Sequence, residues 1–145
     1  MNEKPGGSKE QREAEVYMIS TASQEFGYPL SPKSFHLPNS ARIEVDGVSE
    51  EPAVLCEAWA HIGRVRSAQS DKVMTDALKL VFLEQSAGKK YRKMLLFSDE
   101  RARVHFSGRS WKAACLRYFG IETGVIQLPD DLRRRVLEAQ KRQYR

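Results

Sequence analysis

The predicted fold depends on residues 42–83, which read RIEVDGVSEEPAVLCEAWAHIGRVRSAQSDKVMTDALKLVFL. Two short runs rich in apolar and β-branched residues, Ile43–Val48 and Ala53–His61, flank a polar turn at 49–52. Such a pair of runs predicts a β-hairpin. The long apolar periodicity from Ala68 to Gln85 then predicts an amphipathic helix that packs on the hairpin.

Three acidic residues fall on one face of this predicted hairpin. A four-residue loop at 49–52 places Glu44 directly opposite Glu57, and Asp46 lies two residues further along the same face. Opposed like charges destabilise a hairpin unless a positive group lies between them. The pattern therefore predicts a cation held by the three carboxylates. This prediction depends on the register, because a slip of one residue turns a strand over.

Length and composition indicate one globular domain. The chain has 145 residues, of which 41% are hydrophobic and 30% are charged. Met1–Gln11 is rich in Gly, Pro and charge and is expected to be a disordered tail, so residues 12–145 form the predicted domain. No apolar run approaches the roughly 20 residues of a membrane span, and the N-terminus lacks the apolar core of a signal peptide. We therefore expect a cytoplasmic protein without a membrane partner.

The charge balance permits a polyanionic partner without requiring one. The formal net charge is +5 and the isoelectric point is near 9.3. Basic residues gather in the connection His61–Ser67, which contains Arg64 and Arg66, and in the segment Pro129–Arg145. These groups are typical of a surface that follows a nucleic-acid backbone, and equally of a solvated helix face.

The segments that flank the hairpin predict helices and further strands. Apolar residues recur at helical spacing from Arg12 to Phe26, where Gly27 is suited to end the helix. Three prolines within 28–40 predict a loop with at most a short edge strand near 34–37. Lys93–Ser98 is a short apolar run typical of an interior strand.

The last third of the chain predicts a helix, a strand and a final helix. Ser107 or Ser110 can cap the first of these helices, Thr123–Leu128 forms the strand, and Pro129 starts the last helix. The predicted packing face of the first helix consists of Trp111, Ala114, Cys115 and Tyr118. Cys56 and Cys115 are interpreted as reduced core residues. This order of elements predicts an α/β fold with a parallel βαβ unit and a mixed sheet.

The sequence at this point resembles the core of the PD-(D/E)xK nuclease superfamily. The shared features are a helix, an acid on one strand, an acid on its hairpin partner, a second helix and another strand. The resemblance covers Arg12–Ser98. It implies a three-layer α/β/α sandwich around a mixed sheet, with a restriction-endonuclease-like core and a C-terminal βαβ-helix extension.

The resemblance assigns roles to the hairpin acids. Glu44 or Asp46 stands at the position of the family's first acid, and Glu57 stands for the acid of the (D/E)xK signature. The chain departs from the signature, because Trp59 occupies the lysine position. Glu44, Asp46 and Glu57 are thus the metal ligands that the resemblance implies.

The missing lysine has candidates on the following helix, where some members of the superfamily carry it. Lys72 is the first choice, and Lys79 is the second. Gln69 resembles a glutamine that several exonuclease-like members carry early on this helix. Lys72 and Lys79 also flank Asp76, so a surface ion-pair ladder of little energetic value explains them equally well.

The function that the resemblance implies is hydrolysis of phosphodiester bonds in DNA, dependent on Mg²⁺ or Mn²⁺. Carboxylates are suitable ligands for such hard cations, which lower the pKa of a bound water and stabilise charge at the phosphate. A lysine nearby orients the water or stabilises the transition state.

Simpler explanations of the same residues stay open. Glu57 could form an ion pair with Lys72 or Arg42, and Glu44 and Asp46 could lie on the solvated face of an edge strand. A catalytically inactive member of the same fold, acting as a nucleic-acid-binding or assembly subunit, is the main alternative function. An α/β protein without a nucleic-acid role is a third, and a homodimer or a protein partner is compatible with any of them.

Overall fold

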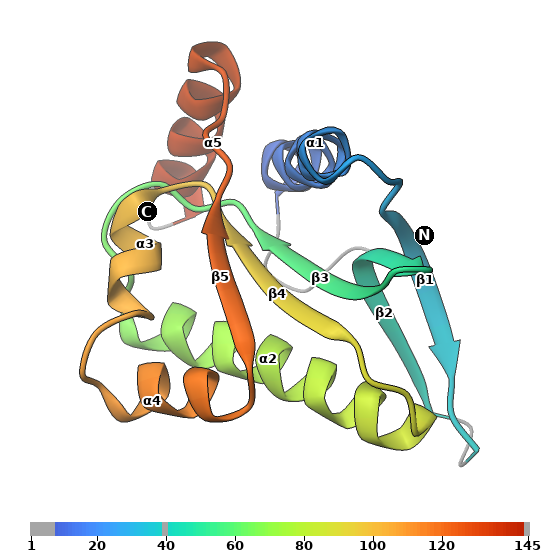
Figure 1. Cartoon of the computed structure of the whole chain (residues 1–145). Coiled ribbons are helices and arrows are strands. Elements are labelled where there is room, and N and C mark those ends of the chain that lie inside the picture. The colour runs from blue at the N-terminus through green and yellow to red at the C-terminus, as the bar shows by residue number, and fades with distance from the viewer. Residues whose placement is uncertain (1–7, 39–40, 144–145) are drawn as a thin grey trace.

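The computed structural model describes residues 8–38 and 41–143, and within them the chain forms five strands and five helices (Figure 1). The strands form one sheet in the order β1-β2-β3-β4-β5. Their bounds are β1 Ser31–His36, β2 Arg42–Glu50, β3 Ala53–Trp59, β4 Arg92–Phe97 and β5 Ile121–Val125. The first three strands pair antiparallel and the last three pair parallel. The predicted α/β class with a mixed sheet is therefore confirmed.

Helices cover both faces of the sheet (Figure 1). Helices α1 and α5 pack on one face, and α2, α3 and α4 pack on the other. Their bounds are α1 Lys9–Phe26, α2 Ser67–Ala87, α3 Glu100–His105, α4 Trp111–Tyr118 and α5 Asp130–Gln143. This arrangement is compatible with the predicted three-layer sandwich. No helix within residues 8–38 and 41–143 is both long and apolar enough to cross a membrane.

The central strand β3 is buried on both faces. Val54 and Cys56 belong to the core beneath α1 and α5, whereas Leu55 and Trp59 belong to the core that contains α2. Strand β4 alternates in the same way. Because the parallel strands are covered on both sides, their sequences read as continuous apolar runs. Glu57 interrupts one such run and is therefore carried into the protein interior.

The first helix begins earlier than the sequence predicts. The Ser8 side chain accepts a hydrogen bond from the Gln11 backbone N–H at 3.0 Å and so caps a helix that starts at Lys9. Residues 9–11 are thus helical, while the predicted tail at 1–7 lies outside the described residues. The helix ends at Gly27, as predicted, with φ of 80°.

The predicted register of the β2–β3 hairpin is wrong by two residues. The turn contains only Glu51 and Pro52, and Glu50 pairs with Ala53. The residue that stands across from Glu57 is therefore Asp46, whose backbone N–H bonds to the Glu57 side chain.

A β-bulge in β2 separates Glu44 from Glu57 further. Against β1, the register changes between the pair Ser31–Val48 and the pair Lys33–Val45. Three residues of β2 thus match two residues of β1, so Val45 and Val48 enter the same core although they are three positions apart. Glu44 consequently lies on the face of α1, whereas Glu57 lies on the face of α2.

Gly47 allows the bulged strand to approach α1 closely. A Cβ atom at this position would lie 3.0 Å from Ile19 Cδ1 and 3.3 Å from Leu30 Cβ. Contacts that short are repulsive, so a side chain here would push α1 away from the sheet. The course of β2 past Asp46 thus depends on a residue without a side chain.

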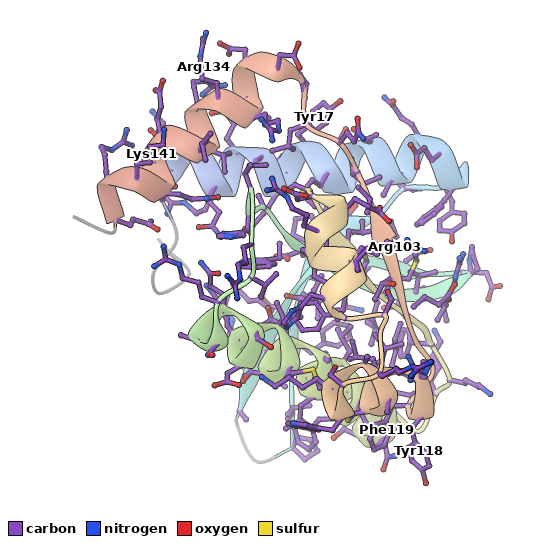
Figure 2. The ribbon with its side chains drawn as sticks, turned by 90° about the vertical axis from the view of Figure 1, so that its left-hand side faces the viewer. Tyr17, Arg103, Tyr118, Phe119, Arg134 and Lys141 are labelled. Atoms are coloured by element: carbon purple, nitrogen blue, oxygen red, sulfur yellow. The ribbon has the colours of Figure 1, made fainter. Side chains whose placement is uncertain are left out.

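The helices of the C-terminal third differ from the prediction in two respects. Helix α3 was not predicted, although Asp99 caps it by accepting the Arg101 N–H at 2.9 Å. In α4, capped by Ser110 as predicted, the buried residues are Ala113 and Leu116. The predicted packing residues Trp111 and Tyr118 are instead 70% and 84% exposed, and Figure 2 shows Tyr118 and Phe119 at the outer end of the helix.

The last strand starts two residues and ends three residues earlier than predicted, and α5 has one buried and one exposed face. Strand β5 ends at Val125. The buried residues of α5 are Leu132, Val136 and Ala139. Arg134 and Lys141 are exposed on its outer side (Figure 2). Cys56 is a buried free thiol and Cys115 is a half-buried one.

Candidate functional site

The backbone ladder between β2 and β3 ends next to two predicted site residues. It runs from Glu50–Ala53 to Gly47–Cys56. Beyond it, the side chains of Asp46 and Glu57 bond to the backbone of the opposite strand. The Asp46 N–H donates to Glu57 Oε1 at 3.1 Å, and the Ala58 N–H donates to Asp46 Oδ2 at 2.9 Å. Each of the two carboxylates is therefore held by a backbone donor.

Glu57 is buried and forms an ion pair with α2. Its side chain is 3% exposed, and Lys79 Nζ lies 3.1 Å from Oε2. Asp76 also lies near this lysine, with 3.9 Å between Asp76 Oδ1 and Lys79 Nζ. A buried carboxylate is tolerated when it is paired, and Lys79 is a partner of Glu57 in the structure. We call Asp46, Glu57 and Lys79 the acid fork.

The remaining predicted helix residues lie along the same side of α2 as Lys79. Gln69, Lys72 and Asp76 are half-buried, at the border of the helix face that packs on the sheet. Gln69 acts at the start of the helix, where its Oε1 accepts the Arg66 N–H at 2.8 Å. This contact gives Gln69 a capping role in the described structure.

Glu44 does not join the fork. Its carboxylate is about half exposed and accepts hydrogen bonds from Arg42 Nη2 at 2.9 Å and Ser34 Oγ at 3.2 Å. Arg42 is therefore engaged with Glu44 and Lys79 with Glu57. Glu44 is solvated, as the simpler alternative expects, but its strand β2 is not an edge strand because it pairs with both β1 and β3.

The fork has a donor set that suits one hard cation. Within residues 8–38 and 41–143, no group of three or more His, Cys, Asp or Glu side chains is arranged to hold a metal ion. The Asp46 backbone N–H bonds to the Glu57 carboxylate, and the Asp46 carboxylate accepts the Ala58 N–H. Mg²⁺ is commonly held by one or two carboxylates, with water and substrate phosphate completing its coordination. Asp46 and Glu57 thus offer oxygen donors of the kind that Mg²⁺ or Mn²⁺ takes, and the predicted set of three ligands is not assembled within these residues.

Cys56, next to the fork, is not suited to nucleophilic chemistry. Burial, and then the neighbouring charges of Glu57 and Asp46, raise the pKa of its thiol far above the ordinary value. A thiolate is the reactive form of cysteine, and these surroundings oppose its formation. The reactive groups of this region are therefore the carboxylates and the lysine.

Glu15 is a buried acid that the sequence prediction did not include in the site. Its side chain is 7% exposed, and its Oε2 accepts the Ala60 N–H at 3.1 Å. It lines a cavity of about 510 Å³ together with Glu44 and Asp46. The helical periodicity could have identified it, because it lies three and four positions before the buried Met18 and Ile19.

Comparisons of the chain with protein-family models, curated proteins and solved structures give no match. The geometry of the side chains is therefore the basis for functional inference.

Proposed function

We propose that the chain is a metal-dependent nuclease domain that hydrolyses phosphodiester bonds in DNA. The observation that supports this proposal is the acid fork, in which the Asp46 backbone N–H bonds to the Glu57 carboxylate and Lys79 Nζ lies 3.1 Å from Glu57 Oε2. Two acids and a lysine are also the set implied by the resemblance to the PD-(D/E)xK superfamily. The lysine would come from α2 because Trp59 occupies its position on the strand.

The chain's own residues would supply orientation and charge. Backbone N–H groups hold both carboxylates in place before any ligand arrives, which lowers the reorganisation needed to bind a cation. A bound Mg²⁺ or Mn²⁺ supplies a lowered pKa for a water ligand and stabilisation of charge at the phosphate. Lys79, released from Glu57, would then donate a charge-assisted hydrogen bond to a phosphate oxygen.

The second candidate is a non-catalytic nucleic-acid-binding or assembly subunit. The observation that favours it is the burial of Glu57, whose side chain is 3% exposed and already paired with Lys79. A cation can enter only if this ion pair opens. A fork that stays closed would serve as a structural ion pair inside the fold.

Cleavage of single-stranded, duplex and branched DNA at millimolar Mg²⁺ or Mn²⁺ distinguishes the two. We expect the parent protein to cut at least one substrate and Glu57→Gln to cut it about 100-fold or more slowly. Glu44→Gln should cut like the parent, because Glu44 lies outside the fork. Manganese should also raise the melting temperature of the parent but not of Glu57→Gln.

Two results would contradict the proposal in different ways. A parent protein that cuts none of the three substrates would leave the non-catalytic candidate. A parent that cuts while Glu57→Gln cuts equally well would show that the fork is not the reactive site. The effect of Lys79→Gln compared with Lys72→Gln then identifies the functional lysine, and we expect Lys79→Gln to have the larger effect.

A further inference from the structure

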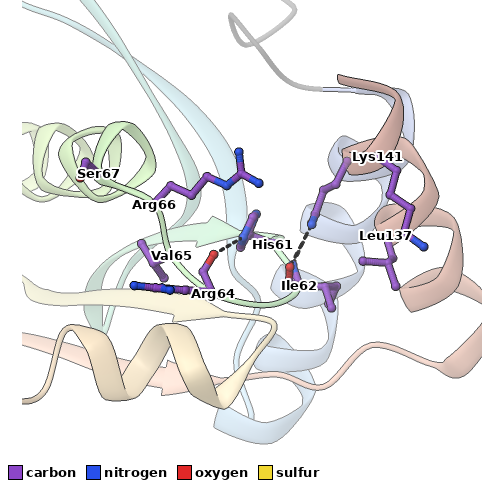
Figure 3. A pocket seen from close by; sticks show the side chains of 9 residues that line it. His61, Ile62, Arg64, Val65, Arg66, Ser67, Leu137 and Lys141 are labelled. Atoms are coloured by element: carbon purple, nitrogen blue, oxygen red, sulfur yellow. Dashed lines mark hydrogen bonds between the residues drawn. The ribbon is translucent and has the colours of Figure 1, made fainter. Parts of the chain in front are cut away.

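A second cavity, of about 780 Å³, lies between the loop after β3 and the last turns of α5 (Figure 3). The loop contributes Arg64 and Arg66, and α5 contributes Lys141. We call these three residues and the space that they line the basic cavity. The basic cavity lies beyond the C-terminal end of β3. The acid fork is a separate site, because Glu57 lies within that strand.

The loop and the helix are joined by reciprocal hydrogen bonds. The Ile62 N–H donates to Gln140 Oε1 at 2.8 Å, and Gln140 Nε2 donates to the Ile62 carbonyl at 2.9 Å. The next residue is also held, because the Gly63 N–H donates to Asp99 Oδ2 at 2.7 Å. These bonds keep the basic loop beside Lys141. The cavity is therefore built before any ligand binds.

At Arg64 and Lys141 the cavity carries positive charge that no ion pair within the described residues neutralises. Arg64, Arg66 and Lys141 are exposed, and within residues 8–38 and 41–143 no ion pair forms to Arg64 or Lys141. Asp99 touches the loop, and its carboxylate is bonded to Arg101 and Gly63. An anion is the ligand that such a surface favours.

The start of α2 strengthens the positive field in the cavity, whereas His61 adds no charge near neutral pH. Ser67, at the first position of the 21-residue helix α2, lines it, so the positive end of the helix dipole faces the same space. His61 lines it as well, and burial lowers the pKa of this imidazole. Its Nε2 lies 3.1 Å from the Arg64 carbonyl, which requires a neutral ring that donates from this nitrogen or a protonated one. The charge thus comes from the arginines and the lysine near neutral pH.

We infer that the basic cavity binds backbone phosphates of a nucleic-acid strand. Three cations from two separate segments suit a polyanion with spaced charges. Insertion into a lipid surface would need exposed apolar side chains, whereas Ile62 and Val65 in the lining are 4% and 8% exposed and Leu137 is half-buried. The cavity therefore favours nucleic acid over an anionic membrane.

This inference extends the proposed function. It rests on that function for the claim that the bound nucleic acid is also the substrate. His61 follows Glu57 by four residues, which corresponds to about 13 Å along an extended strand. At about 3.4 Å per nucleotide along a duplex axis, this spans about four nucleotides. A strand held in the basic cavity would therefore extend about that far to reach the acid fork. Oligonucleotides of two residues should bind much more weakly than those of twelve.

Fluorescence anisotropy with a labelled 12-nucleotide DNA, single-stranded and duplex, in EDTA tests binding without cleavage. The variant replaces Arg64, Arg66 and Lys141 by Gln. We expect its affinity to fall about 10- to 100-fold, and the slope of log K against log salt to decrease in magnitude by about two to three for duplex DNA. Thermal melting of each variant verifies that the fold is retained.

A matched variant separates the cavity from general electrostatics. Lys90→Gln, Arg109→Gln and Arg133→Gln together remove the same charge from exposed positions elsewhere on the surface. We expect this control to lose much less affinity and salt dependence than the cavity variant. Equal losses in both variants, or no DNA binding by the parent protein, would overturn the inference.

The remaining outcomes identify other ligands or separate this inference from the proposed function. Stronger binding to vesicles of phosphatidylserine and phosphatidylcholine than to DNA would show that the ligand is a lipid surface, and it would overturn the inference. If millimolar inorganic phosphate competes completely with DNA, the cavity is a site for a single phosphate ion, and the inference of a bound strand is overturned. DNA binding in EDTA without cleavage in Mg²⁺ supports the basic cavity and removes the nuclease. If the parent protein cleaves DNA while the cavity variant binds DNA as tightly as the parent, the nuclease is supported and the inference about the basic cavity is overturned.

Discussion

The acid fork lies on β3 and the basic cavity lies on the loop that continues it, but the charges of the fork are paired and those of Arg64 and Lys141 are exposed. In the fork, Glu57 is 3% exposed and Lys79 lies 3.1 Å away, so each charge has a partner inside the protein. In the cavity, Arg64 and Lys141 are exposed and form no ion pair within the described residues. The fork is therefore coupled to the stability of the fold, and the cavity is available to a ligand.

The difference follows from desolvation. A buried charge without a partner is expensive, so the fold can keep Glu57 only if Lys79 stays with it. Exposed arginines remain hydrated and cost little when no ligand is present. Substitutions in the fork should consequently change mainly the stability of the fold, and substitutions in the cavity should change mainly the binding of a ligand.

The largest effect is expected when the fork loses the positive charge of Lys79. Lys79→Ala leaves the Glu57 carboxylate buried without this partner, and we expect the free energy of unfolding to fall by about 3–5 kcal/mol, measured by urea denaturation. Adding Glu57→Gln should restore much of the loss, because the uncompensated charge is removed. A single variant as stable as the parent would mean that water solvates Glu57 and that the fork is open.

The next effect concerns the bulge that carries Asp46 to the fork. In Gly47→Ala, the added methyl group would lie 3.0 Å from Ile19 Cδ1. We expect a loss of about 1–3 kcal/mol by the same denaturation experiment. Ile19→Val together with Gly47→Ala should recover part of it, since the shorter side chain relieves the contact. No recovery would assign the cost to the backbone of β2.

An exposed acid at the other end of the hairpin provides a contrast to Glu57. Hydrogen bonds from Lys33 and then Lys89, at 2.6 and 2.9 Å, lower the pKa of Glu50 to about 2. A lowered carboxyl pKa contributes stability above its ordinary value of 4.5, and this contribution disappears as the pH falls toward 2. Because the Glu50 side chain is 47% exposed, we expect less than about 1 kcal/mol.

The pH dependence of Glu50 can be isolated by substitution. The free energy of unfolding of Glu50→Gln, measured between pH 7 and pH 2, should decrease less on acidification than that of the parent. Added salt should weaken the Glu50 contribution more than that of the buried Glu57–Lys79 pair. Identical acid profiles of parent and variant would show that the exposed ion pairs contribute nothing measurable.

The smallest effect on stability is expected in the basic cavity. Arg64→Gln should change the free energy of unfolding by no more than about 0.5 kcal/mol, because the exposed guanidinium forms no ion pair within the described part of the chain. The same substitution should weaken DNA binding in anisotropy. A large loss of stability with unchanged binding would reverse the contrast between the two regions.

Local patterns in the sequence were sufficient for most elements. The helix from Ala68, the interior strand near Lys93 and the buried face of α5 all depend on periodicity and end signals that operate within a few residues. Helix α3 is only six residues long and α4 exposes the aromatic residues that its sequence suggested were buried. Short helices offer too few turns for the apolar face to be identified from the sequence alone.

The hairpin shows where local reasoning ends. Its two strands and the acids Asp46 and Glu57 were recognised, but the pairing of Glu44 with Glu57 was wrong. The register depends on a two-residue turn and on a bulge next to Gly47. The space for that bulge is set by Ile19 and Leu30, which belong to other parts of the chain. A strand pattern with period two contains no information about such a contact.

The sequence by itself determined the α/β class, the order of the main elements and the placing of a carboxylate, Glu57, in an apolar strand, because these follow from composition and short-range periodicity. Only the tertiary structure decided which groups meet. Lys79 pairs with Glu57, Glu44 lies on the opposite face, and Gln140 holds the basic loop against α5. These choices depend on strand register and helix packing, where residues far apart in the chain compete for the same desolvated partners.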